Sequence, residues 1–517
     1  MKKMIYSLAL MLSIQIGTQA QPNVQWQKNY GGNNAERATA TKQTSDGGYI
    51  VAGYTLSDNG DVVGHKNGED YWVLKLNNSG NVVWKKIYGG NNDDRCYDVQ
   101  QTSDGGYILA GTSNSTDGNI SNNKGGFDMW IVKLNASGNI TWKKNLGGSD
   151  DDAAYSIDEL AGGGYVVAGE SKSETGDLDN NKGGYDFWIV KLTATGNLVW
   201  EMNYGGSSDE SAKSVQQCSD GSFIVAGETT SNDYDVSNNK GAYDFWVLRL
   251  RPNGTIRWKN TYGGTSQDNA YSVTQIANGN FIVVGETESN NGNVPNNSGG
   301  DDFLVMNLKG SGAILWSKTF GGESHENARF VRETTDGAVV VAGKTESNSG
   351  DVTNPKGGHD FWVIKVTKSS GNLEWQKTLG GFDNDFAYGI DVTADGAQVV
   401  VGASESDDGD LNNNKGNADF WIVKLGVSGQ RVLAAEAATS REMIVYPNPA
   451  STFVNVAADG LNIEQINVVS IEGKMVSTVM PNAASYQLDV SNLPKGAYFL
   501  KLTLEDGMEK FARLMVD

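Results

Sequence analysis

The chain has 517 residues, of which 65 are Gly and only 8 are Pro, and its formal net charge at pH 7 is −21. Abundant Gly with little Pro is typical of short strands joined by tight turns, and the length allows more than one domain. The strong negative charge argues against nucleic acid and anionic membrane surfaces as partners, because both require clustered Lys and Arg.

Residues 1–20 have the pattern of a secretory signal peptide. Lys2 and Lys3 form a charged start, an apolar run extends from Met4 to Ile16, and Thr18-Gln19-Ala20 offers a small-residue cleavage site. No later segment has the ~18 apolar residues that a membrane-spanning helix requires. The sequence therefore predicts an exported protein with no transmembrane segment.

A segment of 58 or 59 residues is then repeated seven times. Each copy carries a tryptophan, and a Gly-Gly pair begins five residues after it. The tryptophans are Trp26, Trp84, Trp142, Trp200, Trp258, Trp316 and Trp375. A fixed period in this range indicates an array of one supersecondary unit.

Each unit is predicted to contain four short strands. In the third unit these are Ala154–Ile157, Gly164–Gly169, Asp186–Leu192 and a strand that begins at Asn197. All are rich in β-branched and aromatic residues and are bounded by turn formers. The third strand is apolar on both faces, so both faces must be covered. Four-stranded sheets covered by copies of themselves around an axis define a β-propeller.

The strand count predicts seven blades that are closed by both ends of the repeat region. Sets of the first three strands run from Glu36–Leu76 to Asp385–Leu425, whereas the first tryptophan strand, Val24–Tyr30, precedes them all. We therefore expect Val24–Tyr30 to pair with Asp419–Leu425, because this pairing leaves no exposed sheet edge. The propeller is expected over residues 22–428.

One face of this propeller is predicted to carry polar loops. The long connection 173–185 and the turn 205–210 should lie on the same rim, and both are rich in Asp, Asn and Gly. Loops on a rigid scaffold often carry function. Residues 177–181 resemble a Ca²⁺ loop only loosely, since they lack the spacing and final Glu of an EF-hand, and a structural turn is favoured.

Two acidic positions occur in every unit. The first precedes the innermost strand and could bind Ca²⁺ around the channel mouth, or accept hydrogen bonds from turn amides. Its members are Glu36, Asp94, Asp152, Glu210, Asp268, Glu326 and Asp385. Presence in every copy favours the hydrogen-bonding role, because a ring around one axial ligand need not keep every member. The second precedes the third strand and is expected to close the long loop as an Asx-type cap. Its members are Asp70, Asp128, Asp186, Asp244, Asp302, Asp360 and Asp419.

The sequence has few other groups suited to chemistry. His325 and His359 lie in the sixth unit and could hold a transition metal, although surface histidines without a spacing motif are usually solvated. Cys96 and Cys218 fall in units that are not neighbours, so a disulfide is not expected. Cys96 replaces an alanine of the other units and is interpreted as a small buried hydrophobe.

The fifth unit departs from the repeat at three positions. Leu304 replaces Trp, Asn307 replaces Lys or Arg, and Ser298 replaces Lys. Either this sector of the disc is specialised for function, or the three changes are plain drift.

The period stops after Leu425. Residues 429–441 are expected to be a linker, and residues 442–517 a small β-sandwich. Within this tail, Tyr446-Pro447-Asn448-Pro449-Ala450, Gly473-Lys474 and Leu493-Pro494-Lys495-Gly496-Ala497-Tyr498 resemble the type A C-terminal sorting domain of the type IX secretion system of Bacteroidota. The resemblance implies recognition by an outer-membrane translocon, removal of the tail by a sortase-like protease, and release or surface attachment of the propeller. The repeats resemble uncharacterised secreted β-propellers, which offer no catalytic residues to transfer.

The sequence thus predicts an all-β protein, secreted or on the outer cell surface, that binds a glycan or a protein partner and uses no cofactor except, on the acidic ring, Ca²⁺. The alternative is an extracellular polysaccharide-active enzyme, a glycoside hydrolase or a lyase, because paired carboxylates are plentiful. No Gly-x-Ser-x-Gly elbow or Cys–His arrangement is present. An enzyme needs one asymmetric pocket, whereas near-uniform repeats favour binding or scaffolding.

Overall fold

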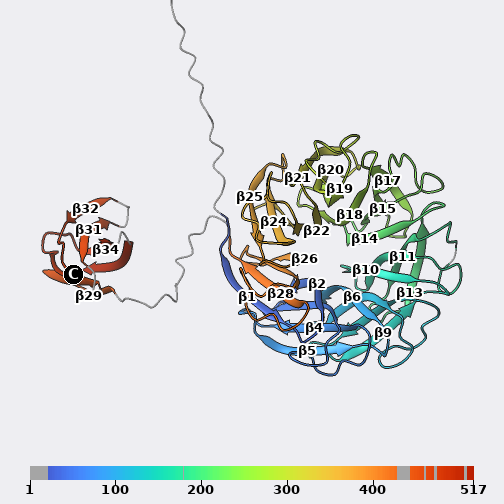
Figure 1. The fold of residues 1–517 in the computed structure, drawn as a ribbon, viewed down its shortest axis with the longest axis horizontal. Helices are drawn as coiled ribbons and strands as arrows, with labels where there is room; N and C mark the ends of the chain where they lie inside the picture. The colour runs from blue at the N-terminus through green and yellow to red at the C-terminus, as the bar shows by residue number, and fades with distance from the viewer. Residues whose placement is uncertain (1–20, 179, 428–442, 459–461, 471–473, 506–508) are drawn as a thin grey trace, which may run out of the picture. The chain divides into compact units, whose positions relative to one another are not determined.

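The computed structural model describes residues 21–178, 180–427, 443–458, 462–470, 474–505 and 509–517. The chain separates into two compact units, residues 1–430 and 431–517, and each is described by itself (Figure 1). The predicted signal peptide and the linker at 429–441 lie outside the described residues. No helix within the described ranges is long and apolar enough to cross a membrane.

The first unit consists of seven four-stranded antiparallel sheets, which confirms the predicted seven-bladed propeller. Blade 1 contains β2 (Glu36–Gln43), β3 (Tyr49–Thr55), β4 (Asp70–Leu76) and β5 (Val82–Tyr88). Blade 2 contains β6 (Asp94–Gln101), β7 (Tyr107–Ser113), β8 (Asp128–Leu134) and β9 (Ile140–Leu146). Blade 3 contains β10 (Asp152–Glu159), β11 (Tyr165–Ser171), β12 (Asp186–Leu192) and β13 (Leu198–Tyr204).

The remaining blades follow the same order. Blade 4 contains β14 (Glu210–Gln217), β15 (Phe223–Thr229), β16 (Asp244–Leu250) and β17 (Ile256–Tyr262). Blade 5 contains β18 (Asp268–Gln275), β19 (Phe281–Thr287), β20 (Asp302–Leu308) and β21 (Ile314–Phe320). Blade 6 contains β22 (Glu326–Glu333), β23 (Val339–Thr345), β24 (Asp360–Val366) and β25 (Leu373–Leu379). Blade 7 contains β26 (Asp385–Val392), β27 (Gln398–Ser404), β28 (Asp419–Leu425) and β1 (Val24–Tyr30).

The two ends of the repeat region meet in blade 7, as predicted. Strand β1 pairs with β28, with Asn29 opposite Trp421. Beyond the strands, the Gly426 N–H donates to the Asn23 carbonyl at 2.8 Å. In blade 1 the Asn77 N–H donates to the Asn81 carbonyl at 2.9 Å and closes the equivalent turn within one continuous chain. The blade formed from both ends therefore has the same local geometry as the others.

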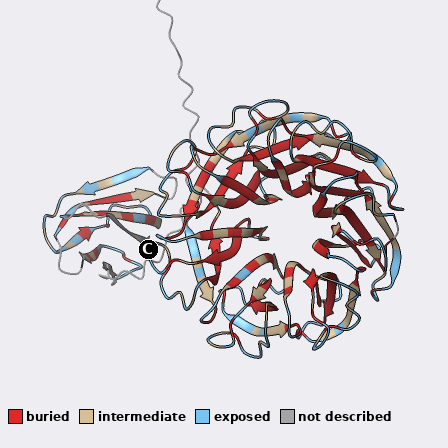
Figure 2. Ribbon diagram, turned by 45° about the vertical axis from the view of Figure 1, so that its right-hand side comes forward, coloured by how far each residue is buried: buried red, intermediate tan, exposed pale blue. Residues whose placement is uncertain are grey.

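Aromatic side chains of the third strands join neighbouring blades. Trp246 of blade 4 packs against Phe187 of blade 3 with ring centroids 4.6 Å apart, and both side chains are fully buried. Complete burial of one such side chain contributes roughly 1.5–3 kcal/mol to stability. In blade 3 the first three strands are mostly buried and the fourth is largely half-exposed (Figure 2). Cys96 is buried and both cysteines are free, as predicted.

In its described residues the second unit has seven strands in two sheets around its own core, which confirms the predicted small β-sandwich. One sheet contains β29 (Met443–Tyr446), β30 (Phe453–Ala458) and β33 (Ser485–Asp489). The other contains β32 (Met475–Val479), β31 (Ile463–Ser470), β34 (Gly496–Leu504) and β35 (Glu509–Val516). Side chains such as Val456, Ile466 and Leu500 are completely buried between them.

Candidate functional site

The innermost strand of every blade contains one β-bulge at the same place. In β10 the pairing with β11 shifts between Ala154 and Ser156, so Tyr155 has no partner across the ladder. A bulge redirects the side chain of its extra residue and is common beside functional sites. The seven bulge residues are Thr39, Tyr97, Tyr155, Lys213, Tyr271, Arg329 and Tyr388.

All seven bulge residues line one pocket of about 360 Å³, which we call the axial pocket. Since every blade contributes one of them, the pocket lies on the propeller axis, where the innermost strands converge (Figure 1). Arg37, Tyr54 and Phe330 complete its lining. Arg37 lies near the start of β2 and Tyr54 near the end of β3, so the pocket faces the rim that carries the long polar loops.

The axial pocket breaks the sevenfold similarity of the blades. Five of its ten lining residues are tyrosine, one is phenylalanine, and three are the cations Arg37, Lys213 and Arg329. None is acidic, although the protein as a whole carries a net charge of −21. The pocket therefore combines aromatic faces with positive charge, and it differs from one blade to the next.

Three buried or half-buried glutamates stand behind this lining. Glu170 accepts hydrogen bonds from the Tyr155 hydroxyl at 2.8 Å and from the Ser211 hydroxyl. The Nζ atom of Lys213 lies 3.7 Å from Glu170 and 3.6 Å from Glu228. Burial raises the pKa of Glu228, and Lys213 opposes that rise. These contacts fix the positions of Tyr155 and Lys213.

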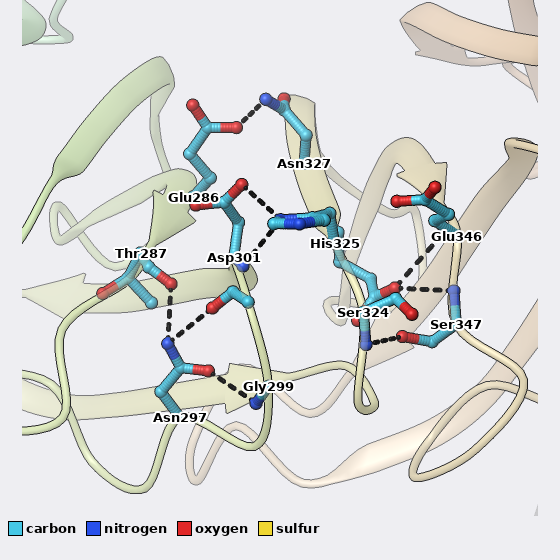
Figure 3. A network of polar contacts seen from close by, with 12 residues as sticks. Glu286, Thr287, Asn297, Gly299, Asp301, Ser324, His325, Asn327, Glu346 and Ser347 are labelled. Carbon is cyan, nitrogen blue, oxygen red and sulfur yellow. Dashed lines mark hydrogen bonds and ion pairs between the residues drawn. The ribbon is translucent and has the colours of Figure 1, made fainter.

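The third glutamate, Glu286, holds the next tyrosine. It accepts hydrogen bonds from the Tyr271 hydroxyl at 2.7 Å and from the Asn269 amide at 3.0 Å. The Asn327 amide of the neighbouring blade also donates to it (Figure 3). The guanidinium of Arg329 lies 4.0 Å from the centre of the Tyr271 ring, a cation–π distance. The pocket wall is thus held in place by contacts between blades.

The first set of predicted site residues lies inside the blades. The Gly206 N–H donates to Glu210 Oε2 at 2.6 Å, and the equivalent contacts in all seven blades measure 2.6–2.8 Å. All seven acids are buried. These contacts support the hydrogen-bonding role. No three or more His, Cys, Asp or Glu residues in the described ranges form a group that could hold a metal, and Ca²⁺ binding by this ring stays a prediction.

The second set of acids closes the long loops, as the sequence predicted. The Lys182 N–H donates to Asp186 Oδ2 at 2.8 Å, and the equivalent contacts measure 2.7–3.1 Å. The other oxygen, Oδ1, is buried without a hydrogen-bond partner among the described residues in each of the seven. Burial, with Glu210 adding to the effect, raises the pKa of Asp186 to about 7.

The two sets of acids meet at the first glycine of each Gly-Gly pair. A Cβ atom on Gly205 would lie 2.0 Å from Asp186 Oδ1 and 2.5 Å from Glu210 Oε2, so no other residue fits. Asp186 belongs to blade 3 and Glu210 to blade 4, and each such pair therefore connects two blades. This arrangement explains why all three residues recur in every unit.

The histidines of the sixth unit do not meet the axial pocket. His325 Nδ1 lies 3.0 Å from Asp301 Oδ2 (Figure 3). His359 packs against the Phe386 ring with centroids 5.1 Å apart, and burial lowers its pKa. Metal binding by these two histidines stays a prediction.

The departures of the fifth unit also lie away from the pocket lining. Leu304 is fully buried in the core between blades, and the Asn307 amide donates to the Lys368 carbonyl at 3.0 Å. The Ser298 N–H takes part in the loop closure at Asp302. These three departures thus make packing and turn contacts, and the residue that blade 5 contributes to the axial pocket is Tyr271 instead.

Sequence reasoning missed the residues of the axial pocket, yet a signal for them is present. The position just before the bulge is Ala in six units and Cys in one, whereas the bulge position itself holds four residue types. A variable position directly after a nearly constant one marks the side chains that the repeat does not need for its own packing.

Comparison with known proteins identifies the tail. Residues 444–517 match the family described as the secretion system C-terminal sorting domain. The protein is therefore a substrate of type IX secretion that is exported to the cell surface or the medium, and the tail interacts with the secretion machinery.

Comparisons of the whole chain find more distant similarities. The regulatory protein FlaEY of Caulobacter vibrioides is 22% identical over 390 residues, which cover 68% of this chain and only 40% of FlaEY. PorZ, a surface component of the type IX secretion system of Porphyromonas gingivalis, aligns with a TM-score of 0.33 at 12% identity, covering 91% of this chain and 69% of PorZ. The WD40 domain of Neurospora crassa Pan2 aligns with a TM-score of 0.40 at 11% identity, covering 76% and 97%. At these values none of the three bears on what this chain binds.

Proposed function

We propose that the propeller is a secreted or cell-surface binding protein that holds a carbohydrate in its axial pocket. The observation that carries this proposal is the ring of seven bulge residues, which gathers aromatic and cationic side chains at one point of the molecule. Ligand pockets are typically concave, rich in aromatic side chains and equipped with a few fixed polar groups. Tyrosine rings offer flat apolar faces to the C–H faces of sugar rings and hydroxyls to their oxygens.

The size of the pocket favours a saccharide over a folded protein partner. A stable protein–protein interface buries about 800 Å² on each partner, whereas the axial pocket is a recess of about 360 Å³. A few sugar units fit such a recess. Two of the tyrosines, Tyr155 and Tyr271, are also held by Glu170 and Glu286, so these two side chains lose little freedom when a ligand binds.

Substitution of the pocket tyrosines tests this proposal. Tyr97→Ala and Tyr155→Ala are each expected to weaken binding of a glycan identified on an array by tenfold or more, because buried aromatic contacts dominate small interfaces. Tyr97→Phe should retain most of the affinity if stacking is the main contribution. Isothermal titration calorimetry gives the affinities.

The matched control is Tyr234→Ala, since Tyr234 is 72% exposed and does not line the pocket. Its affinity should equal that of the wild type. Equal affinities for the pocket variants and this control would contradict binding at the axis.

The second candidate function is an extracellular polysaccharide-active enzyme. It is favoured by the asymmetry of the axial pocket and by Glu228, an acid of raised pKa beside Lys213. Perturbed acids next to a pocket are candidates for general acid catalysis. The test is whether the protein releases reducing ends or unsaturated products from the polysaccharides that it binds. Release by the wild type that is lost in Glu228→Gln would establish an enzyme over simple binding.

Export is proposed to proceed through the translocon, with a sortase-like protease removing residues 442–517. The propeller and the tail have separate cores and are separate compact units. A chain that ends at residue 427 is therefore expected to fold with an unchanged melting temperature, yet to be retained inside the native host. Cell fractionation with immunoblotting measures this.

The converse chain, a signal peptide and reporter followed by residues 430–517, should deliver its reporter outside the cell. Surface delivery of the truncated propeller would contradict the role of the tail in export. Unfolding of the truncated propeller would instead show that the tail is part of its core.

A further inference from the structure

The cations of the axial pocket differ in how they are neutralised. Around the pocket, the described ion pairs join Lys213 to Glu170 and Glu228, and Arg95 to Glu69. Among the described residues, neither Arg37 nor Arg329 forms an ion pair. Arg37 hydrogen-bonds the neutral Tyr54 hydroxyl, and Arg329 stacks on Tyr271.

These two guanidinium groups lie on one side of the axis. Arg329 comes from blade 6 and Arg37 from blade 1, and Tyr388 of blade 7 stands between them. All three residues line the axial pocket. Burial raises the pKa of Tyr388, and both guanidinium groups oppose this rise while Glu405 adds to it. Lys344 of blade 6 does not line the pocket, and Glu286, Glu346 and Asp301 act on it from nearby, so it adds no uncompensated charge.

The opposite side of the pocket is already neutralised. There Lys213 stands between two glutamates, and the rings of Tyr97 and Tyr155 lie against each other with centroids 5.1 Å apart. The pocket thus has a positive side at blades 6, 7 and 1, and an aromatic, charge-balanced side at blades 2, 3 and 4. Glu69 and Glu228 act on Arg37 and Arg329 without forming ion pairs with them, so both guanidinium groups can still donate hydrogen bonds to an anion that binds between them.

We infer that the ligand of the axial pocket is an acidic saccharide, whose carboxylate or sulfate group binds to Arg37 and Arg329 while its sugar ring stacks on Tyr97 and Tyr155. This inference rests on the proposed function and adds the charge and orientation of the ligand. Arg suits this role because its planar guanidinium donates paired hydrogen bonds to carboxylate and sulfate oxygens. The net charge of −21 would repel such a ligand elsewhere on the surface and leave the axial pocket as its site.

The test compares each acidic ligand with its own neutral form. Oligogalacturonate and its methyl ester form one pair, and a sulfated galactan oligosaccharide and its desulfated form make the other. Calorimetry with the full mature chain should show at least tenfold tighter binding of one acidic form over its neutral partner. Added salt should reduce this preference. The pair that shows the preference identifies the acidic group as carboxylate or sulfate.

Matched variants locate the anion. Arg329→Gln and Arg37→Gln should each remove most of the preference for the acidic form, because each lowers the affinity for the acidic form far more than the affinity for the neutral form. Arg257→Gln is the control, because Arg257 lies on the outer strand β17 and pairs with Asp220 there, so it changes net charge equally but away from the axis.

The outcomes separate the two proposals. If the acidic and neutral forms bind equally, or if Arg329→Gln weakens both alike, the inference of an acidic ligand is wrong and carbohydrate binding stands. If none of the four ligands nor any other acidic or neutral glycan on an array binds, carbohydrate binding itself is wrong.

Discussion

Deletion of residues 22–30 is expected to abolish the soluble monomeric propeller. Strand β1 is the outer strand of blade 7, and it pairs along β28 from Val24 opposite Leu425 to Tyr30 opposite Phe420. Without it, β28 becomes an edge strand with unpaired backbone groups and apolar residues on both faces, which promotes aggregation. Size-exclusion chromatography and thermal unfolding measure the loss, which we expect to be nearly complete.

A rearranged chain provides the control for this deletion. It begins at Gly31 and carries Asn-Ser-Gly followed by residues 23–30 after Gly426. This linker copies Asn78-Ser79-Gly80, which joins the equivalent strands of blade 1, and the Gly426–Asn23 hydrogen bond already closes the same turn. The rearranged chain should fold as a monomer with near wild-type stability. A stable monomer from the simple deletion would contradict the closure. Equal stability and equal aggregation of the deleted and the rearranged chain would also contradict it.

The architecture could be predicted because the repeat applies the same physical requirement seven times. The alternation around Trp188, Val190 and Leu192 shows a strand covered on both faces, and six further copies of it remove the ambiguity of a single short apolar run. The closure followed from counting strands, since the tryptophan strand at Trp26 had no blade of its own. The tail could be recognised because its motifs are specific to one sorting route.

The axial pocket could not be predicted in the same way because it depends on a backbone irregularity. In a regular strand, Tyr155 would alternate with Ala154 and Ser156 between the two faces of the blade. The bulge removes Tyr155 from that alternation and directs it to the axis. The variability of this position marks the residue but does not show that the backbone bulges there. The exceptions that stand out in the sequence, Leu304 and Asn307, are buried and lie away from the pocket.

The contacts of the invariant acids also could be predicted only in part from the sequence. Their positions and their turn contacts could be inferred from the spacing of Asp186, Gly205 and Glu210. The sequence did not show that acids from two different blades converge on one glycine, because that contact depends on how the blades pack. The convergence has a consequence for stability that the spacing alone does not suggest.

The propeller is expected to be more stable at pH 5 than at pH 8. Burial raises the pKa of Asp128, Asp186, Asp302 and Asp419 to about 7, and that of Asp70, Asp244 and Asp360 to about 6. An unfolded Asp has a pKa near 3.9, so the folded chain binds more protons than the unfolded chain between about pH 4 and pH 7. The stabilisation from these protons is fully present below the unfolded pKa and is lost as the pH rises through 6 to 7.

The main thermal transition of the mature chain should therefore occur about 5 °C or more higher at pH 5 than at pH 8, because a shift of one pKa unit corresponds to roughly 1.4 kcal/mol and seven groups contribute. Asp186→Asn should narrow the difference between the melting temperatures at pH 5 and pH 8 by raising the value at pH 8. The reason is that an amide keeps the loop contact and carries no charge to desolvate. The control is Asp220→Asn. In the wild type the Asp220 carboxyl pairs with Arg249, and its pKa is lowered to about 2. This carboxylate is ionised at both pH values, so its loss should lower both melting temperatures alike. A melting temperature that rises from pH 5 to pH 8 would show that the buried acids remain charged and hold counter-ions instead of protons.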